Sequence, residues 1–369
     1  MRVLHVDSGR LFGGVETLLV TLARYRDLCP AMESAFALCY HNRLAAELRG
    51  AGSQVHWLGE VRARYPLTVR RARLRLRELL RKRRFDAVVC HLPWAQAVFG
   101  PAVRRAGVPL VFWMHDACRA RHWVERWAKL TKPDFVLCNS DYTASSLPKL
   151  YPETAYEVFR CPVACSRTVM TGEERIALRA KFDTPPNSIV ILQASRLEPW
   201  KGHLVHLDAL ARLRDRPEWV AWFAGGAQTP AEGRYLRELK DLAANLEIAD
   251  RVRFLGSRSD VPLLMRAADI YCQPNTGAEP FGIAFVEALS EGLPVATFSM
   301  GGAGEIVDDA CGVALAPGDV DGLARSLRDL LTDEERRTRL ASAGPARAVE
   351  LCDPRRQIPR LHAILKNLV

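Results

Sequence analysis

The chain has 369 residues and a formal net charge of +10, with 49% hydrophobic and 25% charged residues. Its length exceeds what one hydrophobic core usually organises, and its composition excludes fibrous and intrinsically disordered proteins. No apolar run approaches the roughly 20 residues that span a bilayer, and Met1–Asp7 shows no signal-peptide pattern. We therefore expect a two-domain cytoplasmic protein, with peripheral attachment at the inner face of a membrane as an open option.

The first half of the chain alternates short apolar runs with helical patterns. Val3–Val6 reads as a buried strand, and a glycine loop with Gly13 and Gly14 follows it before a helical period begins at Leu18. The two glycines let backbone approach a ligand closely, although the loop is neither a Walker motif nor a full dinucleotide fingerprint. The alternation continues to about Leu150 and predicts a parallel sheet covered on both faces.

A strongly basic segment lies within this first half. Arg62–Arg84 holds eleven Arg or Lys residues and one acidic residue, Glu78, and its apolar residues recur at helical spacing. This pattern predicts an amphipathic helix with a basic outer face. A solvated surface helix is one interpretation; attraction to an anionic membrane surface or to an anionic acceptor are the others. We expect no nucleic-acid partner, because neither interleaved aromatic residues nor a known binding module accompanies the charge.

The alternation breaks near the middle of the chain and then resumes. We place a first domain at residues 1–165, a linker at 166–187, where periodic patterns are weak and prolines occur, and a second α/β domain at 188–351. A last helix covers about Pro354–Leu368, and we expect residues 352–369 to pack on the first domain. Ligands of such sheets bind at the carboxyl ends of the strands, so two facing domains would hold a site between them.

Two basic residues follow the first predicted strand of the second half. Arg196 and Lys201 lie on one loop after the apolar run Ser188–Ala194. An Arg fork and a Lys point charge together suit a pyrophosphate, although two exposed loop charges are also common.

The stretch Gln273–Gly292 carries two carboxylates around the start of a predicted helix. Glu279 precedes the helix, which begins near Gly282, and Glu287 lies one turn after Ile283 on the same face. The first turn of a helix offers unpaired N–H groups to an anion, and a carboxylate below it can accept hydrogen bonds from a vicinal diol such as a ribose. Together with Arg196 and Lys201, this arrangement favours a nucleotide.

Glycines also end several predicted strands of the second half. Gly225–Gly226, Gly256–Arg258 and Gly301–Gly304 can be plain turns, or can let backbone lie against a bound nucleotide. The ten cysteines lie mostly in apolar runs, which favours reduced, buried thiols. Cys161 and Cys165 lack further ligands at zinc spacing, so we expect no metal.

These motifs resemble a known family. The segments Ser195–Gly202, Glu279–Ala288, Gly292–Val295 and Gly301–Val307, in this order and spacing, are similar to family 4 retaining glycosyltransferases of the GT-B fold. The first half matches at Gly13–Glu16, at His115 and at Asn139–Ser140. The resemblance implies an α/β fold of two doubly wound Rossmann-like domains facing across a cleft, with the C-terminal helix crossing back to the first domain.

The resemblance also implies roles for individual residues. Arg196 and Lys201 would hold the donor diphosphate and offset its growing charge. Glu287 would bind the ribose, Glu279 and the backbone of Phe281 and Gly282 the sugar, and His115 would lie at the donor sugar or the reacting centre. The catalytic set is then His115, Arg196, Lys201 and Glu279. The donor-binding set is Gly13, Gly14, Arg196, Lys201, Gly256, Arg258, Glu279, Pro280, Phe281, Gly282, Ile283 and Glu287.

The resulting hypothesis is a retaining transferase that moves a hexosyl unit from a UDP- or GDP-sugar to a hydroxyl acceptor, without a metal or other cofactor. The family context suggests cell-envelope polysaccharide or glycolipid assembly, with a saccharide, a lipid-linked saccharide or a small molecule as acceptor. A sugar-nucleotide epimerase or a non-catalytic nucleotide-sugar-binding protein on the same fold is the alternative. Glu279 is either a sugar-binding residue or a nucleophile, as in two-carboxylate hydrolases; we favour the former.

Overall fold

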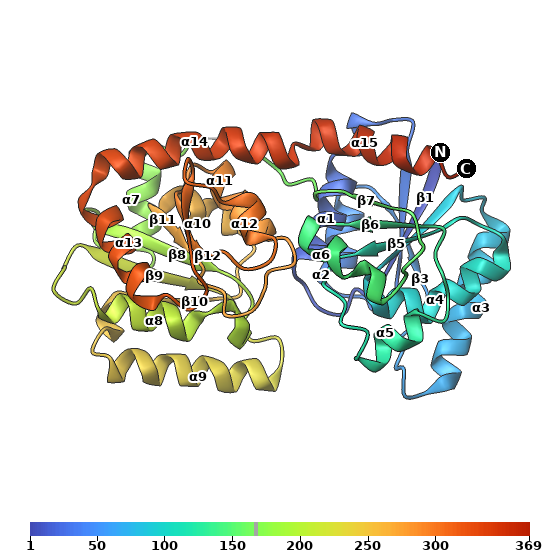
Figure 1. Cartoon of the computed structure of the whole chain (residues 1–369), viewed down its shortest axis with the longest axis horizontal. Coiled ribbons are helices and arrows are strands. Elements are labelled where there is room, and N and C mark those ends of the chain that lie inside the picture. The colour runs from blue at the N-terminus through green and yellow to red at the C-terminus, as the bar shows by residue number, and fades with distance from the viewer. Residues whose placement is uncertain (166–168) are drawn as a thin grey trace. The chain divides into compact units, whose positions relative to one another are not determined.

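The computed structural model describes residues 1–165 and 169–369, which divide into two compact units (Figure 1). Unit 1 comprises Met1–Ala164 with Cys352–Val369, and unit 2 comprises Cys165–Leu351. Each unit contains one parallel sheet flanked by helices, the doubly wound class that the sequence predicts. In the described part of the chain, no helix is both long and apolar enough to cross a bilayer.

Unit 1 is built on a seven-stranded sheet of order β3-β2-β1-β4-β5-β6-β7, in which every neighbouring pair is parallel. Its elements are β1 (Arg2–Asp7), α1 (Gly14–Arg24), η1 (Arg26–Leu28), β2 (Glu33–Leu38), α2 (Arg43–Gly50), β3 (Gln54–Trp57), α3 (Pro66–Lys82), β4 (Ala87–His91), α4 (Leu92–Ala106), β5 (Leu110–Met114), α5 (Trp123–Ala128), β6 (Phe135–Cys138), α6 (Asp141–Ser146), η2 (Leu147–Lys149), β7 (Tyr156–Val158) and α15 (Pro354–Lys366). The strands β4 and β5 are buried along their whole length. Burial on both faces explains why they read as continuous apolar runs.

Helices cover both faces of this sheet. Phe36 and Leu38 of β2 pack with residues of α1 and α2, whereas Ala35 and Ala37 of the same strand pack in the cluster that includes α3 and α4. This alternation is the period of two that sends successive strand side chains to opposite faces. The basic helix α3 buries its apolar stripe and leaves most of its arginines exposed, as its spacing predicts.

Unit 2 contains a six-stranded parallel sheet of order β10-β9-β8-β11-β12-β13. Its elements are α7 (Gly172–Ala180), β8 (Ile189–Ala194), η3 (Pro199–Lys201), α8 (His203–Ala211), β9 (Trp219–Ala224), α9 (Pro230–Asn245), η4 (Ala249–Arg251), β10 (Val252–Gly256), α10 (Val261–Ala267), β11 (Ile270–Cys272), α11 (Ile283–Ser290), β12 (Val295–Phe298), α12 (Ala303–Ile306), β13 (Gly312–Leu315), α13 (Val320–Thr332) and α14 (Glu334–Cys352). The order places β8 and β11 side by side at the centre, although about 75 residues separate them in sequence.

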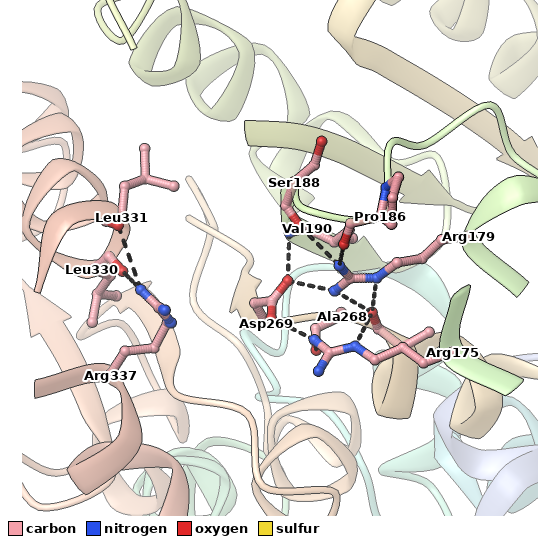
Figure 2. Close-up of polar contacts among 11 residues, drawn as sticks. Arg175, Arg179, Pro186, Ser188, Val190, Ala268, Asp269, Leu330, Leu331 and Arg337 are labelled. Atoms are coloured by element: carbon pink, nitrogen blue, oxygen red, sulfur yellow. Dashed lines mark hydrogen bonds and ion pairs between the residues drawn. The ribbon is translucent and has the colours of Figure 1, made fainter. Parts of the chain in front are cut away.

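The predicted linker at 166–187 needs a correction in its described part. Helix α7 lies within it and packs on unit 2 through two arginines that converge on Asp269, as Figure 2 shows. The buried Arg179 donates to Asp269 Oδ2 at 2.6 Å, to the Ala267 carbonyl at 2.8 Å and to the Ser188 carbonyl at 2.8 Å. Residues 166–168 lie outside the described part of the chain.

Four short elements were not expected from the sequence: α5, β7, α12 and β13, with three to six residues each. Such segments are too short to show a period. Helix α14 spans Glu334–Cys352 and so reaches the end of unit 2. The last helix, α15, packs on η1 of unit 1. Just before it, at the end of α14, the Cys352 carbonyl accepts a hydrogen bond from the Val163 N–H at 3.0 Å.

Candidate functional site

Two loops of unit 2 meet where β8 and β11 end. A Cβ added at Gly202, whose φ is +76°, would lie 1.8 Å from the Pro274 carbonyl oxygen, so only glycine fits between the loops. The Trp200 carbonyl accepts from the Thr276 N–H at 2.9 Å and from the Gly277 N–H at 3.3 Å. The loop that carries Arg196 and Lys201 is thereby joined to the stretch that carries Glu279.

The centre of the site is an ion pair between these loops. Lys201 Nζ lies 2.7 Å from Glu279 Oε2, and the side chains are only 14% and 9% exposed. Asn275 donates to the same oxygen at 2.7 Å, and Gln273 donates to it at 3.4 Å. Lys201 is therefore a shielded partner of Glu279 and not the exposed loop cation that the sequence had suggested. Charge-assisted bonds of this kind hold the carboxylate in one orientation.

The other oxygen of Glu279 is open to a ligand. In the described residues, every hydrogen bond of this carboxylate goes to Oε2, and none goes to Oε1. Behind the carboxylate, the buried Tyr271 hydroxyl donates to Gln273 Oε1 at 2.7 Å, and Gln273 donates to Asn275 Oδ1 at 3.0 Å. These hydrogen bonds fix the orientation of the Gln273 and Asn275 side-chain amides, so Glu279 presents one preorganised acceptor oxygen.

Arg196 is held on the same loop by carboxylates. Its guanidinium pairs with Glu232 at 3.1 Å and with Glu198 at 3.2 Å, while its Nε is buried and has no hydrogen-bond partner within residues 1–165 and 169–369. Glu232 also accepts from the backbone N–H groups of Gln228 and Thr229 at the start of α9. Because the Nε–H is buried, Arg196 can meet an anion only through the terminal nitrogens of its guanidinium; the side chain is 31% exposed.

The start of α11 follows Glu279 directly. Gly282 precedes the helix with a φ of +107°, and a Cβ there would lie 2.5 Å from the Phe285 ring. Phe281 is buried. Because α11 begins at Ile283, its first-turn N–H groups follow Glu279 within a few residues of the chain. The Gly302 N–H donates to the Glu279 carbonyl at 2.7 Å, and a Cβ at Gly302 would meet the Pro280 carbonyl at 2.8 Å. The loop after β12 thus supports the same segment.

Glu287 lies one turn along α11 and is partly buried. In the described part of the chain, its carboxylate has no hydrogen-bond or ion-pair partner. Burial, with a smaller contribution from the nearby Glu291 carboxylate, raises the pKa of Glu287 to about 7. A carboxylate that gives up solvent without gaining a partner is costly unless a ligand supplies hydrogen bonds.

The structure does not link the predicted Gly256 and Arg258 to this ion pair. The Gly256 carbonyl accepts from the Gly225 N–H at 2.9 Å, which ties β10 to the end of β9. Arg258 forms a two-bond pair with Asp260, at 2.8 and 2.5 Å, and its guanidinium lies 5.2 Å from the centre of the Phe182 ring.

The remaining predicted residues belong to unit 1. Gly13 caps α1 and its N–H donates to Glu16 Oε2 at 2.9 Å, and Gly14 is the first residue of the helix. His115 follows β5 and is buried, and its backbone carbonyl accepts from Asn139 at 3.2 Å. A hydrogen bond of 2.8 Å joins His115 Nε2 to His91 Nδ1.

Several residues that shape the site were missed from the sequence: Gln273, Asn275 and Glu232 in unit 2, and His91 in unit 1. Gln273 and Asn275 lie directly after an apolar run, and polar residues at a strand's carboxyl end are a usable sequence indication. Glu232 is the third helical residue after Thr229 and reads only as a capping box, which it also forms.

Both halves of the chain match known protein families. Residues 174–347 match the model of the glycosyl transferases group 1, and residues 12–167 match that of glycosyltransferase family 4. The lipopolysaccharide core biosynthesis glycosyltransferase LpsE of Rhizobium meliloti (strain 1021) is 30% identical over 212 residues, which cover 57% of this chain and 58% of LpsE. The D-inositol 3-phosphate glycosyltransferase of Stackebrandtia nassauensis is 29% identical over 285 residues, 70% of this chain and 63% of that protein. The chain thus matches less than two thirds of the length of these relatives.

The fold is shared with a solved structure over almost its whole length. Anabaena Alr3699/HepE, crystallised in complex with UDP and glucose, superposes with a TM-score of 0.88 at 26% identity, covering 99% of each chain. Two Rossmann-like sheets of seven and six strands, with the C-terminal helix on the first unit, are the GT-B fold.

Proposed function

Because the chain belongs to the glycosyl transferases group 1 family, we propose that it transfers a hexosyl unit from a nucleoside diphosphate sugar to a hydroxyl acceptor, with retention at the anomeric carbon. The observation that carries the proposal is the Lys201–Glu279 pair, which presents one open carboxylate oxygen beside the start of α11. Unit 2 would bind the donor and unit 1 the acceptor.

The donor is assigned by chemistry along one edge of unit 2. Glu287 accepts hydrogen bonds from the two ribose hydroxyls, since its carboxylate is partly buried and has no partner among the described residues. The N–H groups at the start of α11, the terminal guanidinium nitrogens of Arg196 and the ammonium of Lys201 bind the diphosphate. Glu279 Oε1 accepts from hydroxyls of the sugar, and Pro280, Phe281 and Ile283 shape the adjoining backbone.

The reaction exchanges one carbon–oxygen bond for another on the same face of the sugar. The bond from the anomeric carbon to the diphosphate breaks, the acceptor oxygen bonds to that carbon, and the acceptor proton passes to the leaving diphosphate. Positive groups and helix N–H groups that stabilise the departing charge accelerate such a step. Glu279 then needs only to orient the sugar, because Lys201, Asn275 and Gln273 hold its other oxygen in place.

A donor panel tests the proposal. Purified protein is mixed with UDP, GDP and their hexose conjugates, and thermal unfolding is followed, since a ligand bound only by the folded state raises the Tm by mass action. We expect stabilisation by one nucleotide and its conjugate, and release of the nucleoside diphosphate when an acceptor is added. Epimer formation without such release would contradict transfer and favour the epimerase alternative. Stabilisation without turnover of any kind would favour a binding protein.

The donor base and the setting are narrower proposals that rest on the relatives. Alr3699/HepE was crystallised with UDP-glucose, whereas a relative from Mycolicibacterium smegmatis is a GDP-mannose-dependent phosphatidylinositol monomannoside mannosyltransferase. A UDP- or GDP-hexose and an envelope saccharide or glycolipid acceptor fit both. Cytoplasmic reaction at the inner face of the membrane is consistent with this setting.

Helix α3 supplies a surface for such attachment. Arg70, Arg73 and Arg77 line a groove of about 540 Å³ with Arg105 of α4, and Leu74 and Trp127 contribute apolar wall. Leu67 and Leu74 are 65% and 51% exposed on the same helix. Exposed leucines among arginines suit a bilayer interface with anionic headgroups, so we propose that α3 contacts the membrane.

A further inference from the structure

Three buried histidines of unit 1 form a hydrogen-bonded row across three adjacent strands. His5 lies in β1, His91 ends β4 and His115 follows β5. His5 Nδ1 is 3.0 Å from His91 Nε2, and His91 Nδ1 is 2.8 Å from His115 Nε2. The rings of His91 and His115 are stacked, with centres 5.1 Å apart and planes inclined by 12°.

The row is uncharged at neutral pH. Burial lowers the pKa of His5 and of His115 to about 3, and it lowers the pKa of His91 well below its ordinary value. No ion pair involves the three rings in the described residues. A neutral imidazole has one N–H and one lone pair. Two successive ring-to-ring hydrogen bonds can therefore point in only two ways, both toward His115 or both toward His5.

The closed end of the row decides between these directions. His5 Nε2 is buried and has no hydrogen-bond partner in the part of the chain that the structure describes. If the bonds pointed toward His5, this nitrogen would be a buried N–H without an acceptor, which is costly and is the rarer kind of unpaired group. If they point toward His115, the same nitrogen is a bare lone pair and the proton of His115 resides on Nδ1.

The open end of the row is His115 Nδ1. In the described residues this nitrogen has no hydrogen-bond partner, and it is not among the fully buried polar atoms that lack one. It therefore reaches solvent from an otherwise buried ring. His115 Nε2, in contrast, is occupied by His91 at 2.8 Å.

We propose that His91 and His5 are positioning residues that hold His115 as its Nδ1–H tautomer, so that His115 offers substrate a hydrogen-bond donor and not a base. The tautomer is argued from unit 1 alone, whereas the role of His115 toward substrate rests on the proposed function. An Nδ1–H donates to a sugar hydroxyl or to a phosphate oxygen of the donor substrate. It has no lone pair with which to take the acceptor proton, so that proton passes to the leaving diphosphate.

The tautomer is tested directly by NMR on the full chain labelled with ¹⁵N-histidine. Long-range proton–nitrogen correlations distinguish a protonated from a bare ring nitrogen, and a His115→Phe variant assigns the signals. We expect protonated Nδ1 and bare Nε2 at His115 at neutral pH. A protonated Nε2, or an imidazolium, would overturn the proposal. This reading needs no substrate, so it decides the tautomer even if no glycosyl transfer is found.

Kinetics test the consequence for catalysis. His91→Phe should lower kcat by about 10- to 100-fold, by analogy with metal-binding histidines whose orienting hydrogen-bond partner is removed, with a smaller effect on KM for the donor. His91→Gln, which offers both an N–H and an oxygen, should retain more of the activity than His91→Phe. Parental kcat in His91→Phe, with His115 unchanged in the spectrum, would disprove the positioning role.

A matched control separates positioning from general loss of a buried hydrogen bond. Gln96 of α4 is fully buried in unit 1 and donates to the Thr131 carbonyl at 2.9 Å. Gln96→Leu should destabilise the fold to a similar degree as His91→Phe, yet leave the His115 tautomer and kcat near parental values. An equal loss of kcat in both variants would show that His91 matters only for stability.

Discussion

Lys201 Nζ and Glu279 Oε2, 2.7 Å apart, join two loops from neighbouring strand ends in a largely buried ion pair. Each residue therefore holds the two loops together and also carries one of the charges of the candidate site. A bound diphosphate would have to share Lys201 with Glu279, and substitution of either residue has consequences for both stability and turnover.

A double-mutant cycle separates these consequences. Lys201→Met and Glu279→Gln should each lower the free energy of unfolding by about 3 kcal/mol, because each leaves a buried partner unpaired. The double variant should recover at least half of that loss, while all three variants lose most turnover. Urea unfolding and nucleoside diphosphate release measure the two effects.

The control for this cycle is an exposed ion pair in the same unit. Arg214 and Glu247 are 2.8 Å apart with side chains 54% and 79% exposed. Arg214→Met should change stability by less than about 0.5 kcal/mol. If Lys201→Met were as mild as Arg214→Met, the Lys201–Glu279 pair would not persist in solution.

Glu287 should make nucleotide binding depend on pH. Its pKa of about 7 lies above the ordinary 4.5. The ionised carboxylate is the better acceptor for ribose hydroxyls, so nucleotide affinity should rise between pH 6 and 8 in the parent. Glu287→Gln should bind more weakly at pH 8 and show a flatter profile. A parallel pH profile in both proteins would remove Glu287 from the ribose.

Glu287 should also make stability depend on pH, in the direction opposite to nucleotide affinity. Because folding raises the pKa of Glu287, the folded state holds its proton longer, and this group lowers stability as pH rises from about 4.5 to about 7. Ligand-free Glu287→Gln should therefore be more stable than the parent at pH 8, by on the order of 1 kcal/mol, and little different at pH 4.5. Urea unfolding at the two pH values measures this. Lower stability of the variant at pH 8 would contradict the unpartnered carboxylate.

Arg179 should contribute strongly to the stability of unit 2. It is buried and bonds to three carbonyls and to Asp269 (Figure 2). Arg179→Ala removes a buried donor from these carbonyls and leaves Asp269 with Arg175 as its only arginine partner in the described residues, at a cost of about 3 kcal/mol. Urea unfolding would show the loss directly.

Arg337 is the matched control, because it bonds only to the carbonyls of Leu330 and Leu331 and pairs with no carboxylate in the described residues (Figure 2). Arg337→Ala should cost about 1 kcal/mol. Equal costs for both variants would mean that α7 is not anchored by its charge network.

The α3 surface should bind anionic vesicles. Arg70, Arg71 and Arg77 are exposed, whereas Arg75 is engaged with the Leu58 carbonyl at 3.3 Å and is best left intact. Replacing the three by Gln should weaken co-sedimentation with phosphatidylserine vesicles about 10-fold or more at low salt, and added salt should weaken the parent in the same way.

Three exposed arginines of unit 2 serve as the control for net charge: Arg234, Arg237 and Arg325. Their replacement by Gln removes the same charge from another surface and should leave vesicle binding near the parental level. No binding by the parent, or equal losses in both variants, would dismiss α3 as a membrane surface.

The sequence was sufficient for the α/β class and for the segments that carry the site, because continuous apolar strands and their glycine-rich ends are local patterns. The side-chain pairing was not accessible in the same way. Lys201 meets Glu279 only because β8 and β11 are adjacent in the sheet, and strand order is a tertiary property. Arg196 looked free for the same reason, since its partner Glu232 lies 36 residues further along the chain.

The hydrogen-bonded row of histidines could not be predicted from the sequence for a similar reason. His5, His91 and His115 are 86 and 24 residues apart in sequence, and each by itself is indistinguishable from an isolated buried histidine. Their alignment follows from the strand order β1-β4-β5: the strand directly beside β1 is the fourth strand in sequence.

The placement of α15 on unit 1 has a consequence for biosynthesis. Arg360 of this helix pairs with Glu157, and Ile358, Leu361 and Leu365 are buried. A ribosome makes α15 only after all of unit 2, so the surface that α15 covers waits roughly 10–40 s at typical elongation rates. During that interval the part of nascent unit 1 that α15 covers stays exposed, so unit 1 is complete only after α15 has left the ribosome.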